Sequence, residues 1–162
     1  MNIEPKIKFI ESTRELINTT SNSNTVEMIG LLIKTDPEVF NPEVFFSSQW
    51  FATTIAKIVD KEKVFIEIGC GTGIVSIKTA KENPEIEVYS TDINPKATEM
   101  TLYNAKENNL SNRIHVYTGD VFDGLPKDIK AESIFWAMPF GYLDPEESLN
   151  NRDWQVFDPG YR

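Results

Sequence analysis

Short apolar runs alternate with longer amphipathic segments along most of the chain. Four runs rich in β-branched and aromatic residues predict strands at residues 64–68, 87–91, 114–118 and 133–137. Apolar side chains at helical spacing predict helices over residues 71–82 and 94–109, between the first three strands. The second of these begins with Asn94-Pro95, a capping residue followed by proline at the first helical position. The alternation is typical of an α/β protein with a mostly parallel sheet.

Capping residues and apolar spacing predict helices in the first part of the chain. Asn24 followed by Glu27 indicates a helix start of capping-box type, and the helix would stop before Asp36-Pro37, because the residue before proline avoids the helical region. A further helix follows residues 45–48, since apolar side chains recur at helical spacing from Phe51 to Val59. We therefore expect an N-terminal helical segment over residues 1–44 and a Rossmann-like domain over residues 45–162, with helices on both faces of its sheet.

A glycine-rich turn joins the first strand to the helix after it. Residues 67–73 read Glu-Ile-Gly-Cys-Gly-Thr-Gly, and glycine lets a backbone turn tightly and approach a ligand closely. Asp92 ends the next strand, 21 positions beyond Gly71. An acid at that place can accept hydrogen bonds from the two hydroxyls of a ribose. The pattern therefore predicts a nucleoside site at the carboxyl edge of the sheet.

The spacing also distinguishes between nucleoside ligands. Dinucleotide-binding turns follow the pattern G-x-G-x-x-G and present a helix amino terminus to a pyrophosphate. Here Ile74 follows the glycines, and the carboxylate of Glu67 would repel a pyrophosphate. This disfavours a nicotinamide-dependent enzyme. A cationic nucleoside that carries an amine, such as S-adenosylmethionine, suits the site better.

The turn, Asp92 and the Gly119-Asp120-Val121 segment after the third strand resemble the class I S-adenosylmethionine-dependent methyltransferases, over roughly residues 45–142. The resemblance implies that Glu67 lies near the methionine ammonium and that Asp92 binds the ribose. It further implies that the glycines of the turn form the floor under the cofactor, and that residues 45–47 close over the methionine end. For the adenine, it implies that Ile93 packs on the ring face, that Asp120 accepts from the amino group and that the Val121 amide lies near the ring edge. The implied cofactor-binding residues are Glu67, Gly69, Cys70, Gly71, Gly73, Asp92, Ile93, Asp120 and Val121.

Two reactive side chains have simpler interpretations. Cys70 has no basic neighbour in sequence and is expected to be a packing residue rather than a nucleophile. His115 lies within a predicted strand and is expected to be a structural or surface residue rather than a catalyst. No cluster of cysteine and histidine has the spacing of metal ligands, so we expect no metal.

A second motif follows the fourth strand, at Ala137, Met138, Pro139 and Phe140. The related enzymes that methylate planar nitrogens, among them the release-factor glutamine methyltransferases and nucleic-acid N-methyltransferases, carry asparagine-proline-proline-aromatic here. In them an asparagine oxygen and a backbone carbonyl hold the nitrogen in line with the sulfonium methyl, which is catalysis by positioning. This sequence keeps Pro139 and Phe140, but Ala137 replaces the asparagine and Met138 the first proline. The four positions are the candidate catalytic residues.

The chain of 162 residues is short for the fold that its motifs imply. By the resemblance a complete sheet has seven strands, whereas four are predicted here, and residues 154–157 could form a fifth strand or a docking segment. We therefore expect the later strands to be missing or reduced. The chain would then be a fragment, which we favour, a reduced member of the family, or one half of a dimer or swapped assembly.

Composition and charge indicate which partners and which cellular compartment to expect. Sixteen basic and 25 acidic residues give a net charge of −9, which disfavours nucleic acid as a partner. One cysteine excludes an intramolecular disulfide framework, and no apolar run is long enough to span a membrane. Because residues 1–10 carry charges at Glu4, Lys6 and Lys8, we do not expect them to be a signal peptide. We expect a cytoplasmic methyltransferase acting on a nitrogen of a protein or small molecule. The alternative is a non-catalytic module that keeps the fold, because the motif at residues 137–140 is altered.

Overall fold

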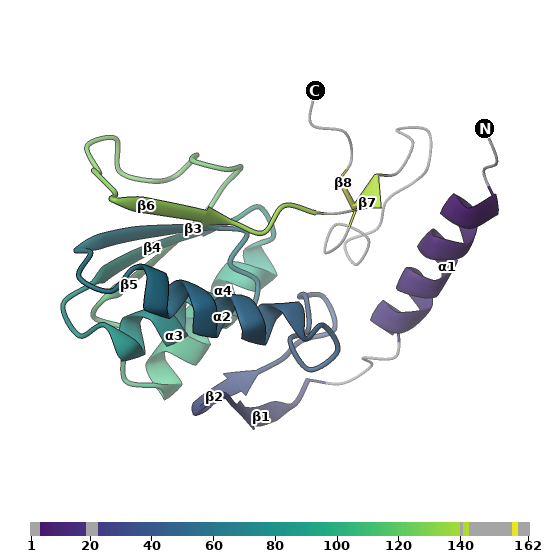
Figure 1. Cartoon of the computed structure of the whole chain (residues 1–162), viewed down its shortest axis with the longest axis horizontal. Coiled ribbons are helices and arrows are strands. Elements are labelled where there is room, and N and C mark those ends of the chain that lie inside the picture. The colour runs from purple at the N-terminus through teal and green to yellow at the C-terminus, as the bar shows by residue number, and fades with distance from the viewer. Residues whose placement is uncertain (1–3, 19–22, 140, 143–156, 159–162) are drawn as a thin grey trace.

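The computed structural model of the chain describes residues 4–18, 23–139, 141–142 and 157–158. Helix α1 (Glu4–Asn18) comes first and lies apart from the sheet in Figure 1. A hairpin of β1 (Thr25–Met28) and β2 (Leu31–Lys34) follows, and then helix α2 (Ser47–Ile58). The α/β unit consists of β3 (Val64–Ile68), α3 (Ile74–Glu82), β4 (Glu87–Asp92), α4 (Pro95–Glu107), β5 (Ile114–Thr118) and β6 (Ser133–Trp136).

The four main strands form one parallel sheet in the order β5-β4-β3-β6. The chain steps from β3 to β4 to β5 in one direction and then returns to the far side of β3 for β6. All four strands lie where the sequence predicts them, and the mostly parallel, Rossmann-like sheet is confirmed. The reversal of strand order lies between β3 and β6, which is where open α/β sheets bind ligands.

Helices α2, α3 and α4 all lie on one face of this sheet, as Figure 1 shows. We expected helices on both faces. Because β3 to β4 and β4 to β5 are steps in the same direction, right-handed connections place α3 and α4 on the same side. The connection from β5 to β6 crosses to the other side, but its residues 119–132 form turns and no helix.

The hydrophobic core lies between the sheet and these helices. Phe65 and Val88 of the strands are buried against Ile77 and Ala80 of α3 in one cluster. Helix α2 covers the end of the sheet near β6, where the rings of Phe51 and Phe135 lie 5.2 Å apart. The core therefore anchors the beginning of α3, and with it the glycine-rich turn, to β3.

The helix predicted to follow Asn24 is wrong, because this segment is the β1–β2 hairpin. Its two-residue turn consists of Ile29 and Gly30, which have φ angles of 47° and 76°. Two successive positive φ angles match the twist of paired strands and are incompatible with a right-handed helix. Leu31 and Ile33 of β2 join the same hydrophobic cluster as Phe65, so the hairpin shares the core of the sheet.

Two short strands, β7 (Gly141–Tyr142) and β8 (Phe157–Asp158), pair in parallel. Of the segment 154–157, in which we considered a fifth strand or a docking segment, residues 154–156 lie outside the described residues. Within the described part of the chain, no helix is long and apolar enough to cross a membrane.

Alternate burial along β2 gives a test of the hairpin. Ile33 is fully buried, whereas Leu32 beside it is 45% exposed. Ile33→Ala should lower the free energy of unfolding by about 2–5 kcal/mol, because it leaves a cavity, and Leu32→Ala by less than about 1 kcal/mol. Urea unfolding of both variants measures the difference. Equal losses would contradict the strand, since residues 32 and 33 would both lie on the inner face of the helix predicted from the sequence.

Candidate functional site

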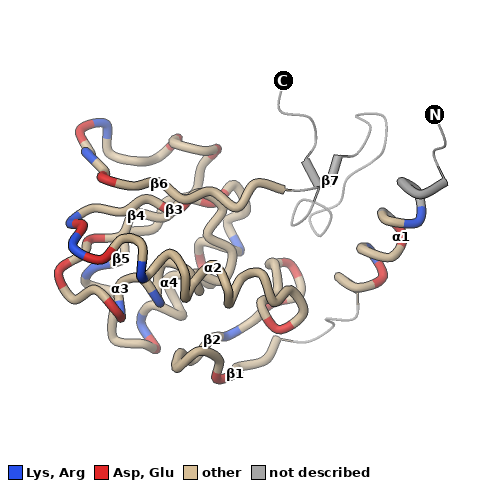
Figure 2. Tube along the Cα trace, viewed as in Figure 1, with Lys and Arg blue, Asp and Glu red and all other residues tan. Residues whose placement is uncertain are grey.

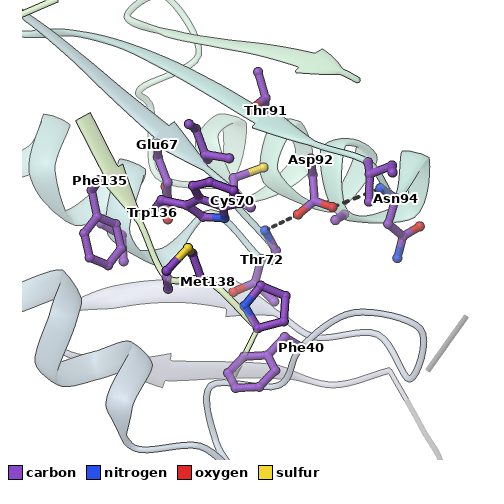
Figure 3. A pocket seen from close by; sticks show the side chains of 18 of the residues that line it. Phe40, Glu67, Cys70, Thr72, Thr91, Asp92, Asn94, Phe135, Trp136 and Met138 are labelled. Carbon is purple, nitrogen blue, oxygen red and sulfur yellow. Dashed lines mark hydrogen bonds between the residues drawn. The ribbon is translucent and has the colours of Figure 1, made fainter. Parts of the chain in front are cut away.

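A cavity of about 630 Å³ opens at the carboxyl ends of β3, β4 and β6 (Figure 3). This volume is typical of sites for small molecules and cofactors. The structure brings nearly all of the predicted site residues to it. Those that line it are Glu67, Gly69, Cys70, Gly71, Asp92, Ile93, Asp120, Val121, Ala137, Met138 and Pro139. Gly73 is not in the lining, and Phe140 lies outside the described residues.

The carboxyl of Glu67 is buried at the end of β3, with 3% of the residue exposed. Its Oε2 accepts a hydrogen bond from the Ser76 amide at 2.9 Å and another from the Ser76 hydroxyl. The Ser76 hydroxyl also lies 2.6 Å from the hydroxyl of Ser90. Since Ser76 lies in the first turn of α3, Glu67 satisfies an amide that the helix leaves unpaired. This helix amino terminus is therefore already occupied by a carboxyl of the chain itself.

Burial raises the pKa of Glu67 from 4.5 to about 8, although the hydrogen bonds from Ser76 oppose the shift. Desolvation dominates because a charged carboxylate loses its water and gains no basic partner. At neutral pH the carboxyl of the ligand-free protein is therefore mostly protonated.

Asp92 lies where β4 ends, and each of its oxygens accepts one backbone hydrogen bond. Oδ2 accepts from the Gly71 amide and Oδ1 from the Asn94 amide, both at 2.9 Å (Figure 3). Burial raises the pKa of this carboxyl too, and the two amides oppose that shift. A carboxylate has about four lone-pair positions, so Asp92 is oriented by the protein and can still accept hydrogen bonds from a ligand.

Gly73 acts through packing rather than by lining the cavity. Its φ is 78°, and a Cβ atom there would lie 2.7 Å from Cγ2 of Thr101 on α4. The Thr101 hydroxyl donates to the carbonyl of Gly71 at 3.0 Å, and it also lies 3.3 Å from the sulfur of Cys70. Burial raises the pKa of the Cys70 thiol well above its usual value, which agrees with a packing role. The glycine therefore sets how closely the turn approaches α4.

The turn after β5 presents Asp120 and Val121 to the cavity. Val121 has a φ of 47°, which is a rare conformation for a β-branched residue. The Thr91 hydroxyl holds it by donating to the Val121 carbonyl at 2.7 Å. Gly119 is required here, since a Cβ atom would lie 2.1 Å from the carbonyl oxygen of Asp123. Strained backbone of this kind is common at ligand sites.

The segment after β6 contributes Ala137, Met138 and Pro139 to the same cavity. Met138 is 63% exposed. Of the residues expected to close over the methionine end, Ser47 lines the cavity. The ring of Phe45 stacks on that of Phe40 at 4.2 Å, and Phe46 is 76% exposed. The predicted catalytic motif and the predicted cofactor residues therefore share one cavity.

Sequence reasoning missed the contribution of the segment that follows the hairpin. Val39 and Phe40 line the cavity, and the segment turns at Asp36 and Asn41, whose side chains accept from the amides two residues later. These Asx turns, at Asp36-Pro37 and Asn41-Pro42, were the signal for an irregular segment. Nothing in the local sequence shows that this segment packs against the glycine-rich turn.

The cavity is acidic. Its acidic lining residues are Glu67, Asp92 and Asp120, and the described lining contains neither lysine nor arginine. In the part of the chain that the structure describes, no group of histidine, cysteine, aspartate or glutamate could hold a metal ion. The site therefore favours a ligand with positive charge.

Fold and cavity together define a Rossmann-like protein with an acidic cavity at the carboxyl edge of its sheet. The model of the family "Methyltransferase small domain" matches residues 30–141, which is more than half of the chain, so the chain belongs to this family. The resemblance inferred from the sequence is thereby confirmed, and with it S-adenosylmethionine as the cofactor.

The chain is similar to two curated proteins. It is 38% identical over 81 residues to a release factor glutamine methyltransferase of Aquifex aeolicus, covering 50% of this chain and 28% of that protein. It is 30% identical over 136 residues to a putative protein N5-glutamine methyltransferase of Methanocaldococcus jannaschii, covering 83% of this chain and 64% of that protein. The chain thus spans less than two thirds of either relative.

A solved structure, that of the tRNA m1G37 methyltransferase of M. jannaschii, is similar with a TM-score of 0.58 and 27% identity. The similarity covers 72% of this chain and 34% of that protein. It confirms the Rossmann-like fold.

The pKa of Glu67 predicts how stability depends on pH. The carboxyl ionises near 4.5 in an unfolded chain and near 8 in the folded protein. Between these values the folded state holds the extra proton, so the parent protein loses stability as pH rises. Glu67→Gln lacks this titration and should gain stability relative to the parent from about pH 5 to about pH 8, by at most about 1.4 kcal/mol per pH unit.

Urea unfolding across this pH range measures the difference. The control is Glu85→Gln, which removes a carboxyl whose side chain is 82% exposed and should follow the parent at every pH. A stability difference between Glu67→Gln and the parent that does not change with pH would contradict the raised pKa.

Proposed function

We propose that the chain is the cofactor-binding part of an S-adenosylmethionine-dependent methyltransferase that transfers the methyl group by in-line displacement to a nitrogen of a protein or small molecule. The supporting observation is the shared cavity, in which Asp92 and Glu67 face the same space as Ala137 to Pro139. A bound cofactor and an acceptor nitrogen would lie next to each other in this cavity, so the methyl group would not have to pass through solvent.

The proposed cofactor contacts follow from the orientation of each group. Asp92, held by two amides, accepts from the ribose hydroxyls through its remaining lone pairs. Ile93, which is 45% exposed, packs on the adenine together with Val121, and Asp120 accepts from the adenine amino group. Glu67 interacts with the methionine ammonium directly or through water. Its proton is released when the cationic cofactor binds, because a nearby positive charge favours the carboxylate.

The acceptor end favours backbone rather than side-chain recognition. Ala137 offers no side-chain oxygen where the related enzymes have asparagine, so the carbonyl groups of residues 137–139 are the acceptors for the N–H groups of the substrate. Trp136 and Met138 add apolar surface at the cavity. The protein contributes positioning and exclusion of water, and no covalent intermediate is formed.

A protein or small-molecule acceptor is favoured over RNA by charge. The segment between β2 and α2, which supplies Val39 and Phe40 to the cavity, carries acidic positions and no basic ones (Figure 2). The names of the two curated relatives, which refer to glutamine in proteins, support the same choice. RNA is the second candidate, because the solved relative is a tRNA methyltransferase. A non-catalytic binding module is the third, because Ala137 lacks the asparagine side chain.

Cofactor binding tests the first half of the proposal. Isothermal titration with S-adenosylhomocysteine should give saturable heat, whereas NAD should give none. Asp92→Asn should weaken the binding by about 1–3 kcal/mol, the usual effect of losing a charge-assisted hydrogen-bond partner. Asp128→Asn, which changes an exposed acid outside the cavity, is the matched control and should bind as the parent does. Equal affinity in the Asp92 variant would refute the ribose contact.

A methyl-transfer assay tests the second half of the proposal, that the methyl group goes to a protein or small molecule. The chain is incubated with S-adenosylmethionine carrying a labelled methyl group and with separated protein, RNA and small-molecule fractions of a cell extract. Label that enters the protein or small-molecule fraction, and that is lost in Asp92→Asn, supports the proposal. Label that only ribonuclease releases would make RNA the acceptor. Saturable cofactor binding without transfer to any fraction would favour the non-catalytic module.

A further inference from the structure

Asn104 of α4 is fully buried, and its side chain bonds two separate parts of the chain. Its Oδ1 accepts from the Lys34 amide at 2.8 Å, and its Nδ2 donates to the Lys34 carbonyl at 3.0 Å. Nδ2 also donates to the carbonyl of Thr72 in the glycine-rich turn at 2.9 Å. A buried amide whose groups are this fully paired has little freedom to move, since each lost bond leaves an unpaired buried group.

One turn later, Asn108 repeats only the first half of this arrangement. Its Oδ1 accepts from the Leu32 amide at 3.1 Å, and its Nδ2 donates to the Leu32 carbonyl at 2.8 Å. Residues 32 and 34 are alternate residues of β2, so the two asparagines bond the free edge of the hairpin as a neighbouring strand would. Its one other described side-chain hydrogen bond is donated to the Asn104 carbonyl at 2.8 Å, and none of these bonds reaches the glycine-rich turn, which makes Asn108 a natural comparison for Asn104.

The segment that leaves the hairpin forms one wall of the cavity. Val39 and Phe40 line it, and the side chain of Asn94, the cap of α4, donates to the carbonyl of Glu38 at 2.8 Å. The ammonium of Lys96 lies 3.9 Å from the carboxylate of Asp36. The hairpin and the segment after it are thus held along the length of α4.

The glycine-rich turn forms another part of the cavity wall, and α4 holds it as well. Thr101 donates to the carbonyl of Gly71, and Asn104 donates to the carbonyl of Thr72, so two successive carbonyls of the turn are bound by one helix. Gly71 and Thr72 line the cavity. Asn104 therefore bonds both the hairpin and the turn. The described hydrogen bonds of the Asn108 side chain go to the hairpin and to the Asn104 carbonyl.

We propose that Asn104 is a positioning residue that couples the β1–β2 hairpin to the glycine-rich turn, so that the affinity for the cofactor depends on a hairpin that does not itself line the cavity. This inference rests on the proposed binding of S-adenosylmethionine in the cavity. The coupling is reciprocal: an ordered hairpin strengthens cofactor binding, and bound cofactor stabilises the hairpin.

The first test compares Asn104→Ala with the control Asn108→Ala. Titration with S-adenosylhomocysteine should show a dissociation constant raised about tenfold or more for Asn104→Ala and changed less than about twofold for Asn108→Ala. Both variants are expected to melt at a lower temperature, so loss of stability alone does not distinguish them. Unchanged affinity in Asn104→Ala, or equal weakening in both variants, would overturn the coupling.

Hydrogen exchange without ligand separates this inference from the proposed function. Asn104→Ala should speed exchange both at the hairpin amides and at the amides of Gly71 and Gly73, which are hydrogen-bonded in the turn. Asn108→Ala should speed exchange at the hairpin only. If the parent does not bind the cofactor, the proposed function fails, whereas the coupling fails only if the turn amides in Asn104→Ala exchange as in the parent.

If Asn104→Ala does not fold, hydrogen exchange of the parent protein with and without ligand tests the coupling instead. Saturating S-adenosylhomocysteine should slow exchange of the Lys34 amide, which is bonded to Asn104, more than exchange of the Leu32 amide, which is bonded to Asn108. Equal or absent protection at the two amides would contradict the proposal.

Discussion

The turn from β3 into α3 is the constraint on which the rest of the structure depends. Glu67 pairs with an amide in the first turn of α3, Asp92 accepts from the Gly71 amide, and α4 packs so closely on Gly73 that no side chain would fit. Each contact comes from a different element, and together they leave the turn one conformation. The amides of Gly69 and Cys70 also donate to the Thr91 carbonyl, so the turn is bonded to the carboxyl end of β4, where the cavity lies.

The site carries an electrostatic cost in the absence of a ligand. Two carboxyls with raised pKa values face one cavity, and no lysine or arginine is among its described lining residues. Buried acids without basic partners are unfavourable as anions, so they are either protonated or stabilised by a bound cation. The ammonium and sulfonium of S-adenosylmethionine supply such a charge, which explains why this acidic cavity suits the family's cofactor better than a pyrophosphate. Perturbed carboxyls in a cavity are a common property of functional sites.

The strands and the residues after them could be predicted because they depend on local pattern and on one topological rule. Apolar runs set β3 to β6, and parallel strands bring Glu67, Asp92 and Asp120 to the same edge of the sheet. The hairpin was mistaken for a helix because Val26, Ile29 and Ile33 are spaced three and four residues apart, as on one face of a helix. The positive φ angles of Ile29 and Gly30 place a turn there instead. Helices were expected on both faces, yet residues 119–132 form turns, so the described helices cover one face.

By itself the sequence determined the fold class, the glycine-rich turn with its acids and the family, because these are encoded in short segments and their spacing. Only the tertiary structure decided which backbone groups those side chains bond. Glu67 bonds to Ser76, Gly73 meets Thr101, and Asn104 joins Lys34 to Thr72. Contacts between residues as far apart as Lys34 and Asn104 depend on how whole elements pack, and burial then sets the pKa of a carboxyl. Neither can be read from local pattern, because packing and desolvation are properties of the assembled chain.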